Sequence, residues 1–191
     1  MYRVNEIFYS LQGEGFWTGT PMVFVRLSGC NLACPFCDTD HQDGRPMTAE
    51  EIAQAVRAKG PCKRVCLTGG EPLLQLDREL VDALHRAGYK IHLETNGTRP
   101  VPEGVDWVTL SPKEDFVNGG KVVVEKADEL KLVLAPGADP AKWAGFPASW
   151  HFLQPCAAPD GSDNTAETVA YIQEHPQWRL SLQTHKLLNI R

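Results

Sequence analysis

At residues 30–37 the chain reads Cys30-Asn31-Leu32-Ala33-Cys34-Pro35-Phe36-Cys37, which places three thiols at a C-x3-C-x2-C spacing. The triplet follows the apolar run Met22–Leu27, which predicts a strand that leads into the cysteine loop. Thiolates prefer iron–sulfur clusters, zinc or copper(I) to hard cations. A structural zinc site normally has four protein ligands, and a simple electron-transfer cluster also takes four cysteines. Three local thiols therefore fit a four-iron four-sulfur cluster with one iron left open, or a metal knuckle completed by a distant Cys62, Cys66 or His41.

The composition is that of an ordinary globular protein, with 42% hydrophobic and 23% charged residues among 191. This length favours one domain, and we expect residues 1–191 to form a single core domain. The net charge of −5 disfavours nucleic acid as a partner, because binding to phosphate backbones needs a basic surface. Arg3 and Glu6 interrupt the N-terminal segment, and no apolar run approaches the roughly 18 residues of a membrane span. We therefore expect a cytoplasmic protein with reduced thiols and no membrane contact.

The hydrophobic pattern alternates between strands and helices along the chain, which indicates parallel βα units. Thr48 and Glu51 form a capping-box pattern that predicts a helix ending near Lys59. Further helices are predicted at Leu73–Ala87, followed by Gly88 as a cap, at Pro140–Ala144 and at Thr165–His175. Strands are predicted at Val4–Ser10 (as an edge strand), Met22–Leu27, Arg64–Leu67, Lys90–Leu93, Trp107–Leu110, Leu130–Leu134, Trp150–Leu153 and Arg179–Leu182.

Polar or glycine-rich clusters follow nearly every predicted strand. They are Ser28-Gly29-Cys30, Thr68-Gly69-Gly70-Glu71-Pro72, Glu94-Thr95-Asn96-Gly97-Thr98, Ser111-Pro112-Lys113, Gln154-Pro155 and Gln183-Thr184-His185. Because parallel strands place their C-terminal ends on one side, we expect these clusters to meet at the mouth of a barrel. A complete eight-unit barrel needs about 250 residues, and this chain can hold about six units. We therefore predict an α/β fold, an open and partial (β/α)6-type barrel of parallel strands with its reactants bound across the mouth.

The cysteine triplet, with the aromatic Phe36 before its last cysteine, resembles the signature of the radical S-adenosylmethionine (SAM) enzymes. The stretch Thr68–Pro72 resembles the glycine-rich motif by which these enzymes hold the methionine amino group; taken alone, it is a tight strand-to-helix turn. The resemblance implies that Cys30, Cys34 and Cys37 hold a 4Fe–4S cluster whose open iron binds SAM. One electron from the cluster then cleaves a C–S bond and releases a 5′-deoxyadenosyl radical.

Motifs outside the triplet are similar to one family, the 7-carboxy-7-deazaguanine synthases. They are Glu6–Gly15, Arg26, Cys37–Asp40, Thr68–Pro72, Glu94–Thr98 and the tail Ser181–Ile190. The resemblance implies a homodimer that rearranges 6-carboxy-5,6,7,8-tetrahydropterin into 7-carboxy-7-deazaguanine with loss of ammonia, in the biosynthesis of queuosine and related 7-deazapurines. It also implies reusable SAM, Mg²⁺ and an electron donor such as flavodoxin. The chain departs from some members in its compact cysteine spacing, in the stretch Cys156–Asp160 and in its terminal Arg191, where some relatives have Pro.

The resemblance assigns site residues position by position. Thr39 corresponds to the magnesium ligand. The SAM site corresponds to Phe36, Cys37, Asp38, Gly70, Ser111, Pro112, Lys113, Gln154, Pro155, Cys156 and Ala157. The substrate site corresponds to Leu11, Gln12, Gly13, Glu14, Arg26, Thr68, His185 and the terminal carboxylate on Arg191.

The residue types fit these roles. Arg26 presents a planar fork that suits the substrate carboxylate and keeps its charge. Gln12 and Glu14 offer donors and acceptors for the pyrimidine edge, and His185 suits hydrogen bonding or proton transfer. Thr39 offers the oxygen that magnesium prefers, although a plain turn residue is the alternative. We expect the remaining histidines and cysteines to be structural or solvated: His85, His92, His151, His175, Cys62, Cys66 and, apart from its place beside SAM, Cys156.

Our mechanistic hypothesis is that the adenosyl radical takes hydrogen from C6 of the pterin, the ring contracts and the hydrogen is returned. The protein positions the reactants and shields the radical. Two other functions remain open at this point. An activase that installs a glycyl radical on a partner enzyme would lack a small-molecule carboxylate clamp at Arg26. A zinc-stabilised binding module would keep zinc and show no visible absorbance after reconstitution with iron and sulfide.

Overall fold

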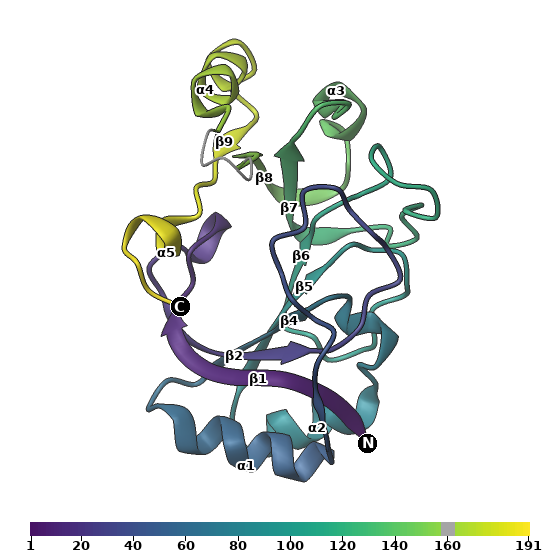
Figure 1. The fold of residues 1–191 in the computed structure, drawn as a ribbon, viewed down its shortest axis with the longest axis vertical. Helices are drawn as coiled ribbons and strands as arrows, with labels where there is room; N and C mark the ends of the chain where they lie inside the picture. Colours follow the sequence, from purple (N-terminus) through teal and green to yellow (C-terminus); the bar gives the residue numbers. More distant parts are fainter. Residues whose placement is uncertain (158–162) are drawn as a thin grey trace.

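The computed structural model describes residues 1–157 and 163–191 of the chain (Figure 1). Its centre is one curved sheet with the strand order β3-β1-β2-β4-β5-β6-β7-β8-β9. The strands are β1 (Tyr2–Leu11), β2 (Pro21–Leu27), β3 (Arg45–Met47), β4 (Arg64–Gly69), β5 (Lys90–Thr95), β6 (Trp107–Leu110), β7 (Ala127–Leu134), β8 (Ala148–Pro155) and β9 (Arg179–Leu180). From β2 onward, omitting β3, neighbouring strands are parallel, whereas β1 pairs antiparallel with both β2 and β3. The predicted open α/β barrel of parallel strands is therefore confirmed.

The outer side of the sheet is covered by α1 (Ala49–Lys59), α2 (Arg78–Arg86), α3 (Pro140–Trp143) and α4 (Thr165–Glu174). Helix α5 (Thr184–Leu187) instead lies in the C-terminal tail, beside the turn after β1. The 3₁₀ turns are η1 (Gly15–Trp17) and η2 (Pro72–Leu74). In Figure 1, α1 and α2 lie below β1 and β2, and α3 and α4 lie at the opposite end of the curved sheet. Among the described residues, no helix is long and apolar enough to cross a membrane.

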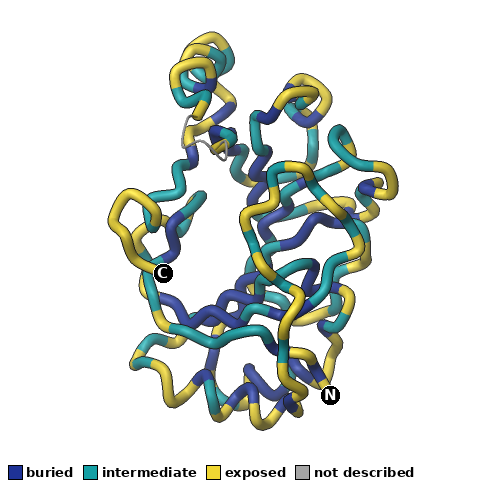
Figure 2. The backbone as a smooth tube through the Cα atoms, viewed as in Figure 1, coloured by how far each residue is buried: buried dark blue, intermediate teal, exposed yellow. Residues whose placement is uncertain are grey.

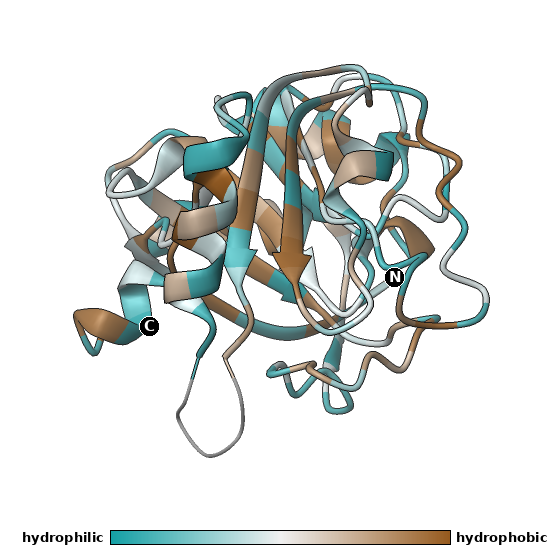
Figure 3. Ribbon diagram, turned by 90° about the horizontal axis from the view of Figure 1, so that it is seen from above, coloured by the Kyte–Doolittle hydropathy of each residue, from teal (hydrophilic) through white to brown (hydrophobic). Residues whose placement is uncertain are grey.

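Alternation along the strands separates the core from the concave face. On β2, Val23, Val25 and Leu27 are fully buried in the core between the sheet and helices α1 and α2. The intervening Phe24 and Arg26 line a cavity on the concave face, because successive side chains of a strand point to opposite faces. Burial is concentrated on the central strands (Figure 2), and hydrophobic segments fall there as well (Figure 3). The sheet thus separates an apolar core from an inner face that carries both apolar and charged side chains.

Most of the predicted elements are present, and the differences have local causes. The capping box is confirmed, since the Thr48 hydroxyl accepts from the Glu51 N–H and the Glu51 carboxylate accepts from the Thr48 N–H. The predicted helix Leu73–Ala87 is wrong in its first turn: η2 occupies Pro72–Leu74, and Asp77 starts α2 by capping Leu80 N–H. Gly88 follows α2 with a φ of 83°, which suits its predicted capping role.

Two connections depart from the repeating pattern. Residues 96–106 and 111–126, which link β5 to β6 and β6 to β7, contain no helix. The predicted edge position of β1 is only partly correct, because β3 pairs with Tyr2–Val4 at its start. The sequence prediction also omitted β3, η1 and α5, and it started β7 three residues late. The barrel therefore has seven parallel strands but fewer covering helices than the pattern predicts.

The two sides of the open barrel are joined by hydrogen bonds rather than by strand pairing. Gly15 N–H donates to Ser181 Oγ over 2.9 Å, and Phe16 N–H donates to Glu129 Oε2 over 3.1 Å. Thr184 N–H donates to Gly13 O over 2.9 Å. The turn after β1 is thereby attached to β7 and to the tail beyond β9, and the tail lies beside that turn at the open edge of the barrel (Figure 1).

Candidate functional site

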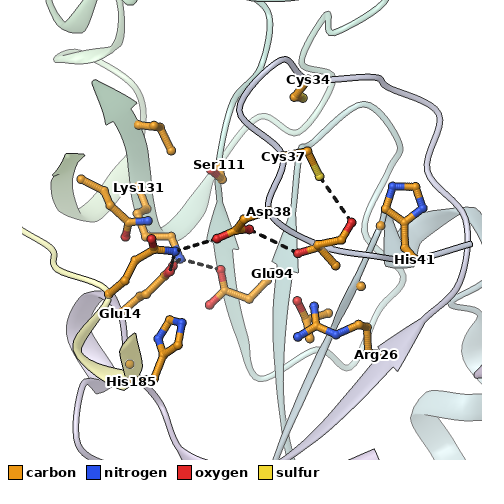
Figure 4. A pocket seen from close by; sticks show the side chains of 18 of the residues that line it. Glu14, Arg26, Cys34, Cys37, Asp38, His41, Glu94, Ser111, Lys131 and His185 are labelled. Carbon is orange, nitrogen blue, oxygen red and sulfur yellow. Dashed lines mark hydrogen bonds and ion pairs between the residues drawn. The ribbon is translucent and has the colours of Figure 1, made fainter. Parts of the chain in front are cut away.

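A cavity of about 430 Å³ opens at the C-terminal ends of the parallel strands. This volume lies in the range of small-molecule sites, about 300–1,000 Å³. The site residues predicted from the sequence all line it except Pro112, which is buried outside the lining. Strand-tip residues of β2, β4, β5, β6, β7 and β8 therefore meet in one place, together with the cysteine loop and the C-terminal tail (Figure 4). Of the stretch Cys156–Asp160, residues 158–160 lie outside the described residues.

The three thiols of the triplet all border the cavity. The loop turns through a hydrogen bond from Cys37 N–H to Cys34 O and is anchored by Gly29 N–H donating to His41 O. Burial raises the pKa of both the Cys30 and the Cys34 thiols. A metal cluster would lower these pKa values again, because it binds the thiolate form. Of the alternative fourth ligands, Cys62 lies outside the lining, while Cys66 and His41 are part of it.

The glycine-rich turn after β4 packs directly against the start of the cysteine loop. A Cβ atom at Gly70 would lie 2.1 Å from Gly29 O and 2.9 Å from Cys30 Cβ, so a side chain does not fit there. Gly69 has a φ of 138°, a conformation that favours glycine. The backbone of both glycines faces the cavity. The backbone of this turn is thus exposed beside the three thiols. It leaves room for a small ligand bound to a cluster that the thiols hold.

Glu71 has a different role from the glycines that precede it. It is fully buried and does not line the cavity. Its carboxylate accepts from Leu73 N–H at 2.9 Å, Thr95 Oγ1–H at 2.7 Å and Asn96 N–H at 2.7 Å. Glu71 therefore fastens the turn to the tip of β5 and holds Asn96 at the cavity wall.

Lys113 supplies a cation on the thiol side of the cavity. Its ammonium donates to Ser111 O and Ser111 Oγ over 2.8 and 2.6 Å. Burial lowers the pKa of Lys113 to about 8, although the nearby Cys34 thiol opposes the shift. The Ser111-Pro112-Lys113 segment therefore places a positive charge where the sequence predicted a contact with SAM.

The opposite wall carries a chain of charged and amide side chains (Figure 4). Lys131 Nζ lies 2.5 Å from Glu14 Oε2 and 3.0 Å from Glu94 Oε2. The other oxygens of these carboxylates accept from amides, Glu14 Oε1 from Gln183 Nε2 at 2.9 Å and Glu94 Oε1 from Gln12 Nε2 at 3.2 Å. Burial alone would raise the pKa of Glu14, but the Lys131 ammonium and the two hydrogen bonds hold it below its usual value. Glu14 is therefore an anionic acceptor at neutral pH.

Glu94, Lys131 and Gln183 were not among the site residues chosen from the sequence. One signal for Lys131 was present, because the run Glu129-Leu130-Lys131 puts two charges at alternate positions of an otherwise apolar strand. Parallel strands covered on both faces are normally continuous hydrophobic runs. Charges at positions i and i+2 therefore indicate a polar inner face.

Arg26 also lines the cavity and is oriented by Glu6. Its Nε donates to Glu6 Oε1 over 2.9 Å, which leaves the two terminal guanidinium nitrogens for another partner. Glu6 Oε2 accepts from the side chain of Arg191, and the guanidinium of Arg191 also lies over the Phe8 ring. A main-chain oxygen of Arg191 accepts from the Ser10 hydroxyl. The C-terminus therefore lies beside Arg26 at the cavity, where the sequence predicted it.

His185 is held against the turn after β1. A Cβ atom at Gly13 would lie 2.1 Å from His185 Nδ1, so glycine is needed for the ring to pack there. Burial lowers the pKa of His185, although Glu14 opposes the shift. The imidazole is therefore mainly neutral near pH 7 and can both accept and donate a hydrogen bond. The histidines predicted to be structural, His85, His92, His151 and His175, all lie outside the cavity lining.

The cysteine loop and the tail meet across the cavity at Asp38. Lys186 Nζ lies 2.6 Å from Asp38 Oδ2, and Gln183 Nε2 lies 3.3 Å from the same oxygen. Burial alone would raise the pKa of Asp38, but these hydrogen bonds and the Lys186 charge lower it. The neighbouring Thr39 hydroxyl faces Asp38 Oδ1 at 3.4 Å. Gln183 thus contacts both Asp38 and Glu14 and connects the two sides of the site.

Glu129 lies beneath this network and gives the first testable prediction. It is only 2% exposed, and burial raises its pKa to about 7. The folded state binds the proton of the Glu129 carboxyl more tightly than the unfolded chain does. The resulting stabilisation of the fold is complete below the ordinary pKa near 4.5 and is lost as the pH rises through 7. We expect wild type to lose up to about 3 kcal/mol more unfolding free energy than Glu129→Gln between pH 5 and pH 8.

Anaerobic urea unfolding of both proteins at several pH values, followed by tryptophan fluorescence, measures this difference. The glutamine keeps an acceptor for Phe16 N–H, so the comparison isolates the titration. A stability difference between the two proteins that does not change with pH would contradict the prediction.

Comparison with known proteins is consistent with this geometry. A model of the radical SAM superfamily matches residues 24–114. A curated 7-carboxy-7-deazaguanine synthase from Bacteroides thetaiotaomicron is 54% identical over 191 residues, which is 100% of both chains. A synthase of the same name from Caulobacter vibrioides is 46% identical, with 99% of each chain covered. The crystal structure of QueE from Escherichia coli matches with a TM-score of 0.77 at 29% identity, covering 95% of this chain and 93% of that chain.

The barrel, the thiol triplet and the glycine turn, together with the superfamily match, define a radical SAM enzyme, a class whose members use a 4Fe–4S cluster and SAM. Within this class, the full-length identities are decisive. The chain belongs to the 7-carboxy-7-deazaguanine synthase family, as its motifs predicted.

Proposed function

We propose that the two walls of the cavity divide the family reaction between them, with cluster and SAM on the thiol side and pterin on the charged side. The enzyme converts 6-carboxy-5,6,7,8-tetrahydropterin to 7-carboxy-7-deazaguanine in 7-deazapurine and queuosine biosynthesis. Product and ammonia together contain all the atoms of the substrate, so the reaction consumes no net oxidant or reductant. When bound, the cluster and SAM supply the 5′-deoxyadenosyl radical. The protein has to bind, orient and shield the pterin.

Cys30, Cys34 and Cys37 would hold the cluster, and the Gly69–Gly70 backbone, Lys113 and Gln154–Ala157 would surround SAM. The observation that best supports the pterin site is the pairing of Arg26 with Glu6, which aims the free guanidinium nitrogens at the cavity. A guanidinium binds a carboxylate through two parallel hydrogen bonds. Glu14 and Glu94 offer acceptors to the N–H groups of the pyrimidine edge.

Apolar groups on the cavity floor favour a shielded radical. The rings of Phe8 and Phe24 stack at 5.0 Å beside the fully buried Cys66. All three line the cavity. An apolar floor keeps water from the reacting carbon and so limits quenching of reactive intermediates.

The test is anaerobic incubation of the reconstituted protein with dithionite, SAM and the carboxypterin, with products identified by mass spectrometry. We expect 7-carboxy-7-deazaguanine and ammonia in equal amounts, in excess over the enzyme. Unchanged pterin in the presence of SAM cleavage would refute this function and favour an activase. Retained zinc without visible absorbance would instead favour the binding module.

We further propose that Thr39 would hold Mg²⁺, which would supply a positive charge beside the pterin. Magnesium takes oxygen ligands and keeps several waters, so one hydroxyl is enough as a protein ligand. Thr39→Val keeps the shape of the side chain and removes the oxygen. We expect turnover to fall about 10-fold or more and to lose its dependence on added Mg²⁺. The matched control is Thr165→Val on α4, and an unchanged magnesium response in Thr39→Val would exclude this ligand.

The remaining family properties are proposals as well. We expect a homodimer, which sedimentation equilibrium tests, and reduction of the cluster by a donor such as flavodoxin, which a reconstituted electron-transfer assay tests. Reduced thiols and an iron–sulfur cluster suit the cytoplasm. Residues 1–191 would act as one domain, because one sheet runs from β3 to β9 and both ends contribute to the cavity.

A further inference from the structure

Lys131 is the residue around which the charged wall is built. Its side chain is only 6% exposed, although it lines the cavity. It contacts one oxygen of Glu14 and one oxygen of Glu94, and Gln183 and Gln12 bind the second oxygens. The five side chains come from β7, from β5, from the turn after β1 and from the C-terminal tail. Lys131 is their only cation.

We propose that Lys131 is a positioning residue, which orients the Glu14 and Glu94 carboxylates so that they accept hydrogen bonds from the pyrimidine edge of the pterin. This proposal rests on the proposed function and adds the residue that prepares the substrate site. Lys131 would act through the two carboxylates rather than on the reacting carbon.

Electrostatics explain why these carboxylates need the lysine. Glu14 and Glu94 lie within reach of the same ammonium, and Glu129 lies two residues from Lys131 on the same face of β7. Without the cation, the partly buried Glu14 carboxylate would lack its counter-charge beside other carboxylates, and its pKa would rise. A protonated carboxyl loses acceptor capacity toward the pterin N–H groups. Lys131 thereby determines both the charge and the direction of the acceptors.

The contacts of Lys131 argue against a role as a proton donor. Burial alone would lower its pKa, but Glu14, Glu94 and Glu129 outweigh burial and raise the pKa well above the usual value for lysine. A general acid works best with a pKa near the working pH. Lys131 is therefore a fixed charge during the reaction.

The experiment compares Lys131→Met and Lys131→Arg in the cluster-loaded enzyme. For Lys131→Met we expect the KM for the carboxypterin and its Kd in equilibrium dialysis to rise roughly 100-fold. SAM cleavage without pterin should stay within about twofold of wild type, which also verifies the fold. Lys131→Arg keeps the charge and should recover most of the affinity. Lys90→Met is the matched control, since it removes a lysine from an ion pair with Asp106 on the same sheet, outside the cavity lining.

A double-mutant cycle with Glu14→Gln tests whether Lys131 acts through its partner. If it does, adding Lys131→Met to Glu14→Gln should cost far less than the 100-fold seen in wild type, because the amide needs no counter-charge. Additive losses, or a lost kcat with unchanged KM and no rescue by arginine, would overturn the proposal. The double variant also has one fewer unpaired buried charge, so it tests the idea if Lys131→Met alone folds poorly. Wild-type turnover of the pterin tests the proposed function separately.

Discussion

Replacing Cys34 with alanine is expected to abolish the enzyme at its first step. Cys34 lies in the middle of the triplet, half-buried at the cavity, with the Lys113 charge nearby. Two thiols cannot hold a four-iron cluster in place of three, so the electron that activates SAM has no source. We expect 5′-deoxyadenosine formation to fall roughly 10⁴-fold or more, together with most of the iron and the visible absorbance.

The control for this variant is Cys62→Ala. Cys62 is also a partly buried free thiol, but it lies outside the cavity lining and donates a hydrogen bond to Arg64 O. Its replacement should leave cluster content and SAM cleavage near wild type. Full iron content and activity in Cys34→Ala would refute the cluster assignment, and loss of both in Cys62→Ala would indicate that Cys62 takes part as a ligand.

Arg26→Ala is expected to separate binding of the pterin from activation of SAM. Arg26 is mostly buried, and Glu6 aims its guanidinium into the cavity. Removing one partner of a buried charge pair leaves the other charge unpaired, so we expect kcat/KM for the carboxypterin to fall roughly 100- to 1,000-fold. The thiol side of the cavity is untouched, so SAM cleavage in the absence of pterin should persist.

The outcome also decides between the proposed reaction and a glycyl-radical activase. Arg26→Lys tests geometry, because a single ammonium cannot make the two parallel bonds of a guanidinium, and it should recover only part of the loss. Arg57→Ala on the exposed face of α1 is the surface control. Equal pterin turnover in wild type and Arg26→Ala would rule out Arg26 as the carboxylate clamp.

Sequence reasoning succeeded where the determinants are local. The capping box at Thr48, strand β6 at Trp107–Leu110 and the glycine after α2 depend on neighbouring residues, and all three are confirmed. It failed where a distant contact overrides the pattern. The apolar stripe predicts a helix from Leu73, but Asp77 both caps α2 and accepts from the hydroxyl of Tyr2, a residue 75 positions earlier.

The candidate site also contains residues that could be predicted from local motifs and residues whose roles depend on distant contacts. Motif positions such as Arg26 and His185 could be assigned because a family keeps residue types at fixed positions. Glu94 lies in a family motif and Lys131 in a pattern of alternating charges, but neither signal indicates which residue is the partner, so their roles could not be assigned. Their roles depend on Glu14, which lies 117 residues from Lys131 in the chain.

The amino-acid sequence by itself indicated the class of chemistry, because the signature of the radical SAM superfamily lies in three thiols at short spacing on one loop. It also determined the parallel strands and the side on which their polar tips gather. Only the tertiary structure decided which charges meet there, since the turn after β1, strand β7 and the tail come together across the open edge of the barrel. The negative charge of Glu14 depends on this arrangement. It is stabilised by the Lys131 ammonium, which only folding brings within hydrogen-bonding distance.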